Sequence, residues 1–198
     1  MKECCEVEAR HVRRDILRIV LAVNLVLFVV EIVAGVLARS TALLGDSLDM
    51  LGDSLVYGVS LYVLVRSDRW KARAAFLKGI VMFAFGAVVL AEVVQKMVSP
   101  TQPMAGVMGT VGILALVGNA VCFWLLYRHR TDDLNMRSTW LCSRNDLLAN
   151  IAVLGAAVGV SLTASHWPDV LVGGAIAALF VQTAFIVVRA SLVELRHA

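Results

Sequence analysis

The chain has 198 residues, of which 60% are hydrophobic and 17% charged, and its formal net charge is +3. Its mean hydropathy of +0.81 excludes a soluble globule, and the low charge excludes a disordered chain or a nucleic-acid-binding protein. The four cysteines, Cys4, Cys5, Cys122 and Cys142, do not have the spacing of a disulfide framework. The composition therefore predicts an integral membrane protein.

Six apolar runs reach the length of about 20 residues that a helix needs to cross a bilayer. Lipid offers no partner to free backbone groups, and no run alternates with period two, so each run predicts a helix rather than a barrel strand. The fold class is therefore an all-α protein with six transmembrane helices, between a segment at 1–15 and a short tail at 190–198. In chain order the runs cover about 16–38, 42–65, 74–98, 105–127, 139–163 and 167–189.

The basic residues predict the orientation of these helices. Lys and Arg are concentrated before the first run, between the second and third, between the fourth and fifth, and after the sixth. Arg39 and Lys96 are the two basic residues at the opposite ends of the runs. Because basic residues gather on the cytoplasmic side of bacterial membranes, both termini are predicted to be cytoplasmic.

Acidic residues interrupt the apolar runs at six positions. An Asp or Glu at the bilayer centre costs about 2.5–3.5 kcal/mol, so each is a candidate functional residue and the set needs compensation by a cation, by protons or by water. We expect Glu31 and Glu92 to pair with Lys78 or Arg144 inside the bundle, and we leave them out of the candidate metal site. The six acids are Glu31, Asp46, Asp49, Asp53, Glu92 and Asp146.

Two of the runs each offer a pair of metal ligands at helical spacing. Asp49 and Asp53 lie four residues apart in the second run, and Cys142 and Asp146 have the same spacing in the fifth. If the two faces meet, three carboxylates and one thiol would suit a tetrahedral divalent transition metal. Two alternatives remain open: the acids line a water-filled vestibule or proton relay, and Cys142 is an ordinary core residue.

Two further polar residues extend these faces. Asp46 lies one turn before Asp49, and Asn150 lies one turn after Asp146. Both are candidate accessory ligands or ligands on the access path of the metal. The alternative for Asp46 is that it caps or solvates the end of its helix.

The order of these residues resembles that of the cation diffusion facilitators, a family of metal/proton antiporters. The resemblance covers nearly the whole chain and implies that Asp49 and Asp53 are the metal ligands of the second helix. It also implies a homodimer in the bacterial inner membrane, with no cofactor and with the metal as substrate. It rests on Asn24, Glu31–Gly35, Ser40–Asp53, Glu92 before Pro100, Asn119, Asn135 and Trp167–Asp169.

The chain departs from the family pattern in two ways. Cys142 stands where family members usually carry a histidine, and the cytoplasmic domain that many members add after the sixth helix is absent from this sequence. Because a thiolate prefers soft or borderline ions, we expect zinc or cadmium, with cobalt, lead or mercury as further candidates, rather than Mn²⁺ or Mg²⁺.

The ligand set predicts how transport would be driven. Three carboxylates and a thiolate cannot all remain ionised in a low dielectric without metal, so protons occupy part of the site and leave when metal binds. We therefore expect a secondary active transporter that exchanges metal for protons by alternating access. The alternatives are a metal-permeable channel or a membrane metal sensor without proton coupling, and, less favoured, an intramembrane aspartyl protease whose sequence motifs the chain lacks.

Overall fold

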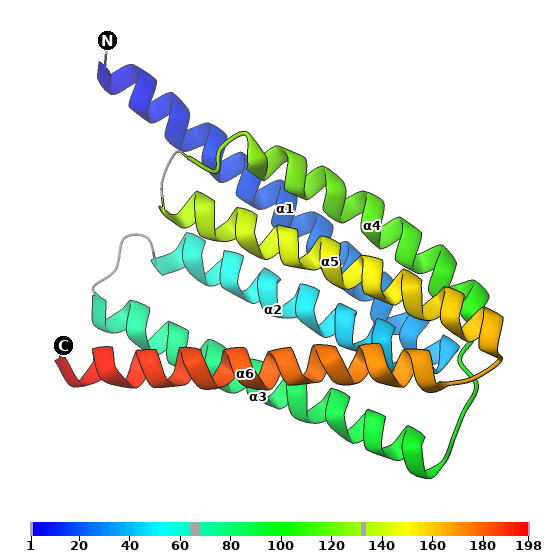
Figure 1. Ribbon diagram of the computed structural model, residues 1–198. Helices are drawn as coiled ribbons and strands as arrows, with labels where there is room; N and C mark the ends of the chain where they lie inside the picture. Colours follow the sequence, from blue (N-terminus) through cyan, green and yellow to red (C-terminus); the bar gives the residue numbers. More distant parts are fainter. Residues whose placement is uncertain (1, 64–67, 132–133, 198) are drawn as a thin grey trace.

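The computed structural model describes residues 2–63, 68–131 and 134–197. Within these ranges the chain forms helices and no strand, which confirms the predicted all-α class (Figure 1). The helices are α1 (Lys2–Ala38), α2 (Thr41–Val63), α3 (Asp68–Val98), α4 (Ala105–Tyr127), α5 (Leu134–Thr163) and α6 (Trp167–His197). The helices α1, α3, α5 and α6 extend beyond the predicted runs, because apolar composition marks the part of a helix that lies in lipid and not its end.

Five helices of the described residues are long and apolar enough to cross a membrane. The remaining helix, α2, carries three aspartates and packs against α1, α3, α5 and α6. Its neighbours therefore shield its acidic face from lipid, as an interior helix requires. The five spans are Arg14–Ala38, Gly79–Val98, Ala105–Tyr127, Ser143–Thr163 and Trp167–Val193.

The helices form two groups that meet at α2. The pair α3 and α6 packs together most extensively and has its own apolar core, which includes Met82 and Phe180. The helices α1, α2, α4 and α5 form the second group (Figure 1). The two groups are joined where α2 contacts both α3 and α6 and where α5 contacts α6.

The two ends of the bundle are distinguished by the chain termini and by the turns between the helices. Helix α1 begins and α6 ends at the same end of the bundle (Figure 1). We call the opposite end, formed by the turns at 39–40, 99–104 and 164–166, the distal end. The assignment of the termini to the cytoplasm stays a prediction.

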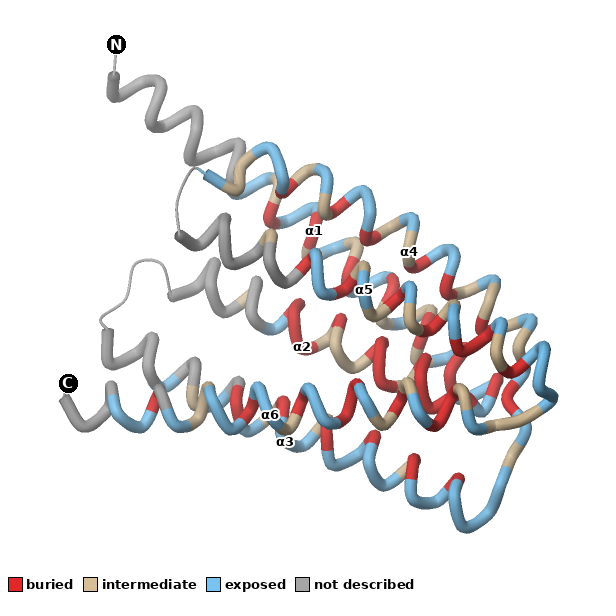
Figure 2. Tube along the Cα trace, viewed as in Figure 1, coloured by how far each residue is buried: buried red, intermediate tan, exposed pale blue. Residues whose placement is uncertain are grey.

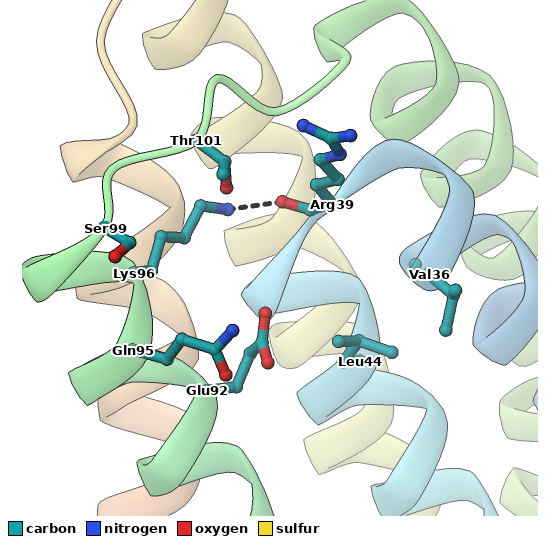
Figure 3. Close-up of a pocket in the computed structure, with 9 residues that line it drawn as sticks. Val36, Arg39, Leu44, Glu92, Gln95, Lys96, Ser99 and Thr101 are labelled. Atoms are coloured by element: carbon teal, nitrogen blue, oxygen red, sulfur yellow. Dashed lines mark hydrogen bonds between the residues drawn. The ribbon is translucent and has the colours of Figure 1, made fainter.

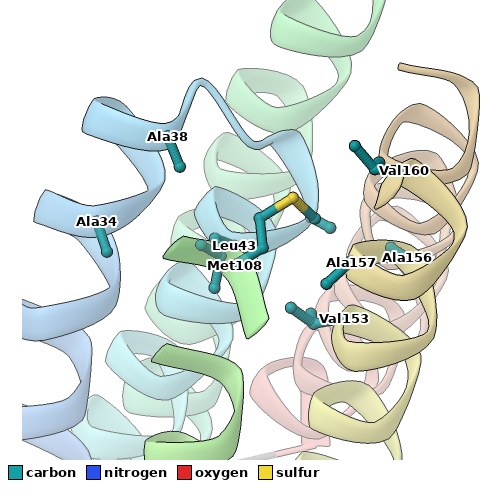
Figure 4. Packing of buried hydrophobic residues seen from close by; sticks show 9 residues of the cluster. Ala34, Ala38, Leu43, Met108, Val153, Ala156, Ala157 and Val160 are labelled. Atoms are coloured by element: carbon teal, nitrogen blue, oxygen red, sulfur yellow. The ribbon is translucent and has the colours of Figure 1, made fainter. Parts of the chain in front are cut away.

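The core of the four-helix group is built largely from small side chains. Near the distal end, Ala34, Ala38, Ala156 and Ala157 pack around Met108 (Figure 4). Small residues let membrane helices approach closely, which is how such bundles gain packing energy. Burial follows the inward faces of the helices (Figure 2). Many large apolar side chains are exposed, where they would contact lipid.

The turn between α1 and α2 is tightly specified. Arg39 has a left-handed backbone (φ 53°), and the N–H groups of Ser40 and Arg39 donate to the carbonyls of Gly35 (2.9 Å) and Val36 (3.2 Å). This is the Schellman pattern that ends a helix. The hydroxyl of Ser40 then accepts the N–H of Leu43 at 3.1 Å, so Ser40 is the N-cap of α2.

Candidate metal centre

Helix α2 places its three aspartates in the protein interior. Asp46 is 1% exposed and Asp53 is 8% exposed, and Asp49 is half-buried. The three positions lie close to one helix face and span about 10 Å along the axis. The alternative that Asp46 caps the helix end is wrong, because Ser40 is the N-cap and Asp46 is buried.

Helix α5 contributes Asp146 and Asn150 to the same interior. Asp146 is 3% exposed and Asn150 is fully buried. The side-chain amide of Asn150 donates to the backbone carbonyl of Asp146 at 2.8 Å, so the two residues lie on one face as their spacing predicts. The side chain of Cys142, the predicted thiol ligand, lies outside the residues whose side chains the structure describes.

The carboxyl groups of α2 and α5 lie within electrostatic range of one another. Asp53 and Asp49 lie close enough to Asp146 for their charges to act on it, and α2 packs directly against α5. Among the described side chains, however, no three His, Cys, Asp or Glu are already arranged to hold a metal ion. Binding at this place would therefore require the carboxylates to draw together around the ion.

Glu31 on α1 lies close to the same carboxyl groups, contrary to expectation. We call the interior carboxyl groups of Glu31, Asp46, Asp49, Asp53 and Asp146 the acidic layer. It is fully buried, neither carboxylate oxygen has a hydrogen-bond partner, and Asp46 and Asp49 act on it electrostatically. Arg144, one of its two expected partners, is exposed, and the side chain of Lys78, the other, lies outside the described residues. The predicted pairing of Glu31 with Arg144 is wrong, because Arg144 sits on a part of α5 that faces away from the interior.

Several buried polar atoms of the interior have no hydrogen-bond partner. One oxygen each of Asp46, Asp146 and Asn150 is buried without a hydrogen bond, and so are both polar atoms of Asn119 on α4. A buried polar group without a hydrogen bond costs free energy that native proteins rarely accept. The layer therefore needs something that the polypeptide does not supply, whether a cation, protons or water.

Cys122 has the role that its sequence context predicts. The thiol is free and fully buried, and it packs with Leu17, Val20 and Leu126 in an apolar cluster between α1 and α4. Its place in this cluster confirms Cys122 as a packing residue.

A second group of buried polar residues, at the distal end, centres on Asp169, whose two carboxylate oxygens both have hydrogen-bond donors. One carboxylate oxygen of Asp169 accepts the Ser40 hydroxyl (2.6 Å) and the Ala42 N–H (3.1 Å). The other accepts the Thr41 N–H (2.8 Å) and the Lys96 ammonium (2.7 Å). We call Asp169, Lys96, Ser40, Thr41 and Ala42 the distal junction.

Sequence reasoning missed the distal junction. The sequence places Lys96 at the end of the third run and Asp169 at the start of the sixth, and it predicts no contact between them. Both side chains are almost wholly buried, at 1% and 0% exposed, although they lie 73 residues apart in the chain. The available signal was the acid in the first turn of α6, a position that favours negative charge.

A pocket of about 300 Å³ opens beside the distal junction, between α1, α2 and α3. Lys96 donates from the pocket wall to the backbone carbonyl of Arg39 (Figure 3). Its neighbour Gln95 and Glu92, one turn away, also line the pocket. The ammonium of Lys96 thus joins α3 to the α1–α2 turn as well as to α6. Glu92 is half-buried here, at the distal end, and away from the acidic layer.

Comparison with known proteins identifies the family. Residues 17–196 match the family described as the cation efflux transmembrane domain. This chain belongs to the cation efflux family. The predicted resemblance to the cation diffusion facilitators is thereby confirmed, and with it the assignment as an integral membrane protein.

The relatives of this cation efflux chain are bacterial metal transporters by name. The chain is 30% identical to "Zinc transporter ZitB" of Pectobacterium atrosepticum over 84% of this chain and 56% of the relative. It is 24% identical to "Metal cation efflux system protein CzcD" of Cupriavidus metallidurans, over 89% and 60%. It is also 24% identical to the "Cadmium, cobalt and zinc/H(+)-K(+) antiporter" of Bacillus subtilis, over 83% and 57%. The chain thus spans less than two thirds of the length of these relatives.

Proposed function

We propose that this chain is a divalent heavy-metal efflux transporter that exchanges its metal for protons. The metal would bind between α2 and α5 through Asp49, Asp53, Cys142 and Asp146, with Asp46 and Asn150 as accessory ligands. The observation that carries the proposal is the interior acidic layer, in which Asp146 has a buried oxygen without a partner beside the carboxylates of α2. Names of relatives that carry zinc, cadmium and cobalt support the same substrate class.

The acidic layer couples metal to protons through simple charge balance. Five carboxyl groups, those of Glu31, Asp46, Asp49, Asp53 and Asp146, occupy the interior near one another. Without metal, mutual repulsion in a low dielectric keeps protons on part of the set. A divalent ion needs deprotonated ligands, so its binding releases protons, and the two cargoes exclude each other.

The choice of metal follows from the softness of the ligands. A site made of oxygen alone would accept Mn²⁺ or Mg²⁺, whereas a thiolate favours zinc, cadmium and softer ions. We therefore place zinc and cadmium first and cobalt, lead and mercury after them. The metal is the transported substrate, and the proposed cycle uses no cofactor or catalytic residue.

The experiment that tests this function uses the purified chain in proteoliposomes with a pH-sensitive dye inside. Zn²⁺, Cd²⁺, Co²⁺ or Mn²⁺ is added outside, and metal uptake and internal pH are followed together. We expect metal-dependent proton movement that ranks the metals and that Asp146→Ala abolishes. Asp15→Ala is the matched control, because Asp15 is an exposed carboxylate outside the acidic layer.

Each other outcome of this experiment has a distinct meaning. Metal entry without proton movement would replace the antiporter by a channel. Metal binding without either flux would indicate a sensor. Full activity of Asp146→Ala would remove Asp146 from the site.

The proposed transporter works in the bacterial inner membrane as a homodimer with cytoplasmic termini. The orientation follows from the distribution of basic residues and the membrane from the bacterial origin of the relatives, whereas the dimer rests on the family resemblance alone. Cross-linking in native membranes and labelling of terminal tags from each side would test the dimer and the orientation.

A further inference from the structure

The distal junction does more than close one end of the bundle, because it holds the first turn of the helix that carries the acids. Asp169 accepts the N–H groups of Thr41 and Ala42, which are free donors at the start of α2. It also accepts the hydroxyl of Ser40, whose oxygen caps the same turn. One side chain of α6 therefore saturates the N-terminus of α2.

Lys96 supplies the charge that makes this arrangement stable. Its ammonium donates to Asp169 and to the backbone carbonyl of Arg39, so α3, α6 and the α1–α2 turn meet at one atom. A buried carboxylate with four donors, one of which is its counter-ion, is well compensated, whereas either charge alone would not be. The carbonyl that accepts this hydrogen bond belongs to Arg39, the left-handed residue of the Schellman turn, which is thereby held in place.

Close backbone contacts reinforce the hold of α6 on α2. A methyl group on Gly173 would lie 2.7 Å from the Thr41 side chain and 3.0 Å from its backbone carbon. One turn further, a methyl group on Gly45 would lie 3.0 Å from the side chain of Ile176. The first two turns of α2 thus lie directly on α6, and the hydrogen bonds of Asp169 set their rotation.

The rotation of α2 decides whether its carboxylates reach a metal. The first candidate ligand, Asp49, lies eight residues after Thr41, or about 12 Å along a continuous helix. A carboxylate stands about 5–6 Å from the helix axis, so a rotation of about 20° moves it by about 2 Å. Metal–ligand distances tolerate deviations of only about 0.2 Å, so a loosened first turn would disturb the site.

We propose that Asp169 and Lys96 are positioning residues of the metal site: by fixing the rotation and depth of α2 against α6 and α3, they place Asp49 and Asp53 opposite Asp146. This inference rests on the proposed function of the acidic layer. It adds that the α3–α6 pair, which contributes no ligand, sets metal affinity. It also implies that any tilt of this pair is passed to the α2 carboxylates.

The decisive variant neutralises the junction without leaving a buried charge. Lys96→Met combined with Asp169→Asn keeps both side-chain lengths and one acceptor oxygen for α2, but removes the ion pair. We expect this double variant to fold, to raise the KM for Zn²⁺ about tenfold with Vmax changed less than threefold, and to alter the ratio of Zn²⁺ to Cd²⁺ transport. Asp169→Asn alone should raise KM less, since Lys96 still holds the Arg39 carbonyl.

Control measurements separate positioning from stability and from failure of the proposed function. Gln95→Leu changes the neighbouring residue of the same pocket and should leave KM unchanged. Thermal unfolding in detergent reports whether each variant is folded. A folded double variant with the KM and metal ratio of the native chain would overturn the inference, provided that Asp146→Ala abolishes transport. If the native chain does not transport metal, or Asp146→Ala transports normally, the proposed function itself fails.

Discussion

Two buried carboxylates, Asp169 at the distal end and Asp146 in the acidic layer, show opposite solutions to the same physical problem. Both are nearly inaccessible, at 0% and 3% exposed. Asp169 has donors for both oxygens and a lysine as counter-ion. Asp146 has an oxygen without a partner and faces other carboxyl groups instead of a cation.

The difference separates structural acids from acids that need a ligand. A carboxylate whose bonds are saturated by the polypeptide ties helices together and has no capacity left for another partner. A carboxylate left unsaturated among like charges raises the energy of the empty protein and lowers it when a cation or protons arrive. The distal junction therefore joins helices, whereas the acidic layer is suited to the metal and proton binding that the proposed function requires.

The largest expected effect concerns the stability of the two places. Lys96→Met leaves the Asp169 carboxylate buried and unpaired and should lower the free energy of unfolding by about 3–5 kcal/mol. Asp146→Asn removes an unsaturated charge and should not lower it. Thermal unfolding of both variants in the same detergent measures the contrast; equal losses would mean that the two carboxylates do not differ in role.

Proton competition sharpens the comparison in the acidic layer. Zinc binding must displace protons from the carboxyl groups, so the apparent affinity should fall as the pH falls, by about tenfold per pH unit for each proton released. Calorimetric titration with Zn²⁺ in buffers of different ionisation enthalpy gives the number of protons. An affinity that is constant between pH 8 and pH 6 would contradict metal–proton exchange.

The close contact of α6 with α2 predicts a smaller effect. Gly173→Ala adds a methyl group 2.7 Å from the Thr41 side chain and should destabilise the protein by about 1–3 kcal/mol through overpacking. Gly155→Ala is the matched control, because nothing lies within 4 Å of a methyl group at that helical position. If both variants unfold at the same temperature, the contact between α2 and α6 is looser than its geometry indicates.

The smallest expected effect concerns the metal preference. Cys142→His replaces a thiolate by imidazole and should shift transport a few-fold toward Zn²⁺ relative to Cd²⁺, because the harder ligand favours the harder ion. Competition between the two metals in the proteoliposome assay measures this ratio. An unchanged ratio would show that the thiol of Cys142 does not contact the metal.

Much of the fold could be predicted, because a membrane helix is marked by a continuous apolar run in the sequence. The predicted run at 105–127 coincides with α4. Each of the other runs lies on one helix, and wherever the helix does not extend beyond the run, the two ends agree within a few residues. The charged extensions were missed, as in α1, which begins at Lys2. Outside lipid a helix no longer needs apolar side chains, so hydropathy cannot show where it stops.

The candidate site was predictable only along each helix. The spacing of Asp49 and Asp53, and that of Asp146 and Asn150, follows from helical periodicity and needs no tertiary information. The expected pairing of Glu31 with Arg144 is wrong, because periodicity within α1 does not show which neighbour its polar face meets.

By itself, then, the sequence determined that this is a membrane protein of apolar helices with acids on four of them, since both properties depend on neighbouring residues. Only the tertiary structure decided that α2 lies in the interior, that Glu31 joins the acidic layer, and that Asp169 and Lys96 hold the start of α2. The physical reason is the same in each case. Whether a buried charge is saturated depends on donors from helices far apart in the chain, and helix packing alone brings them together.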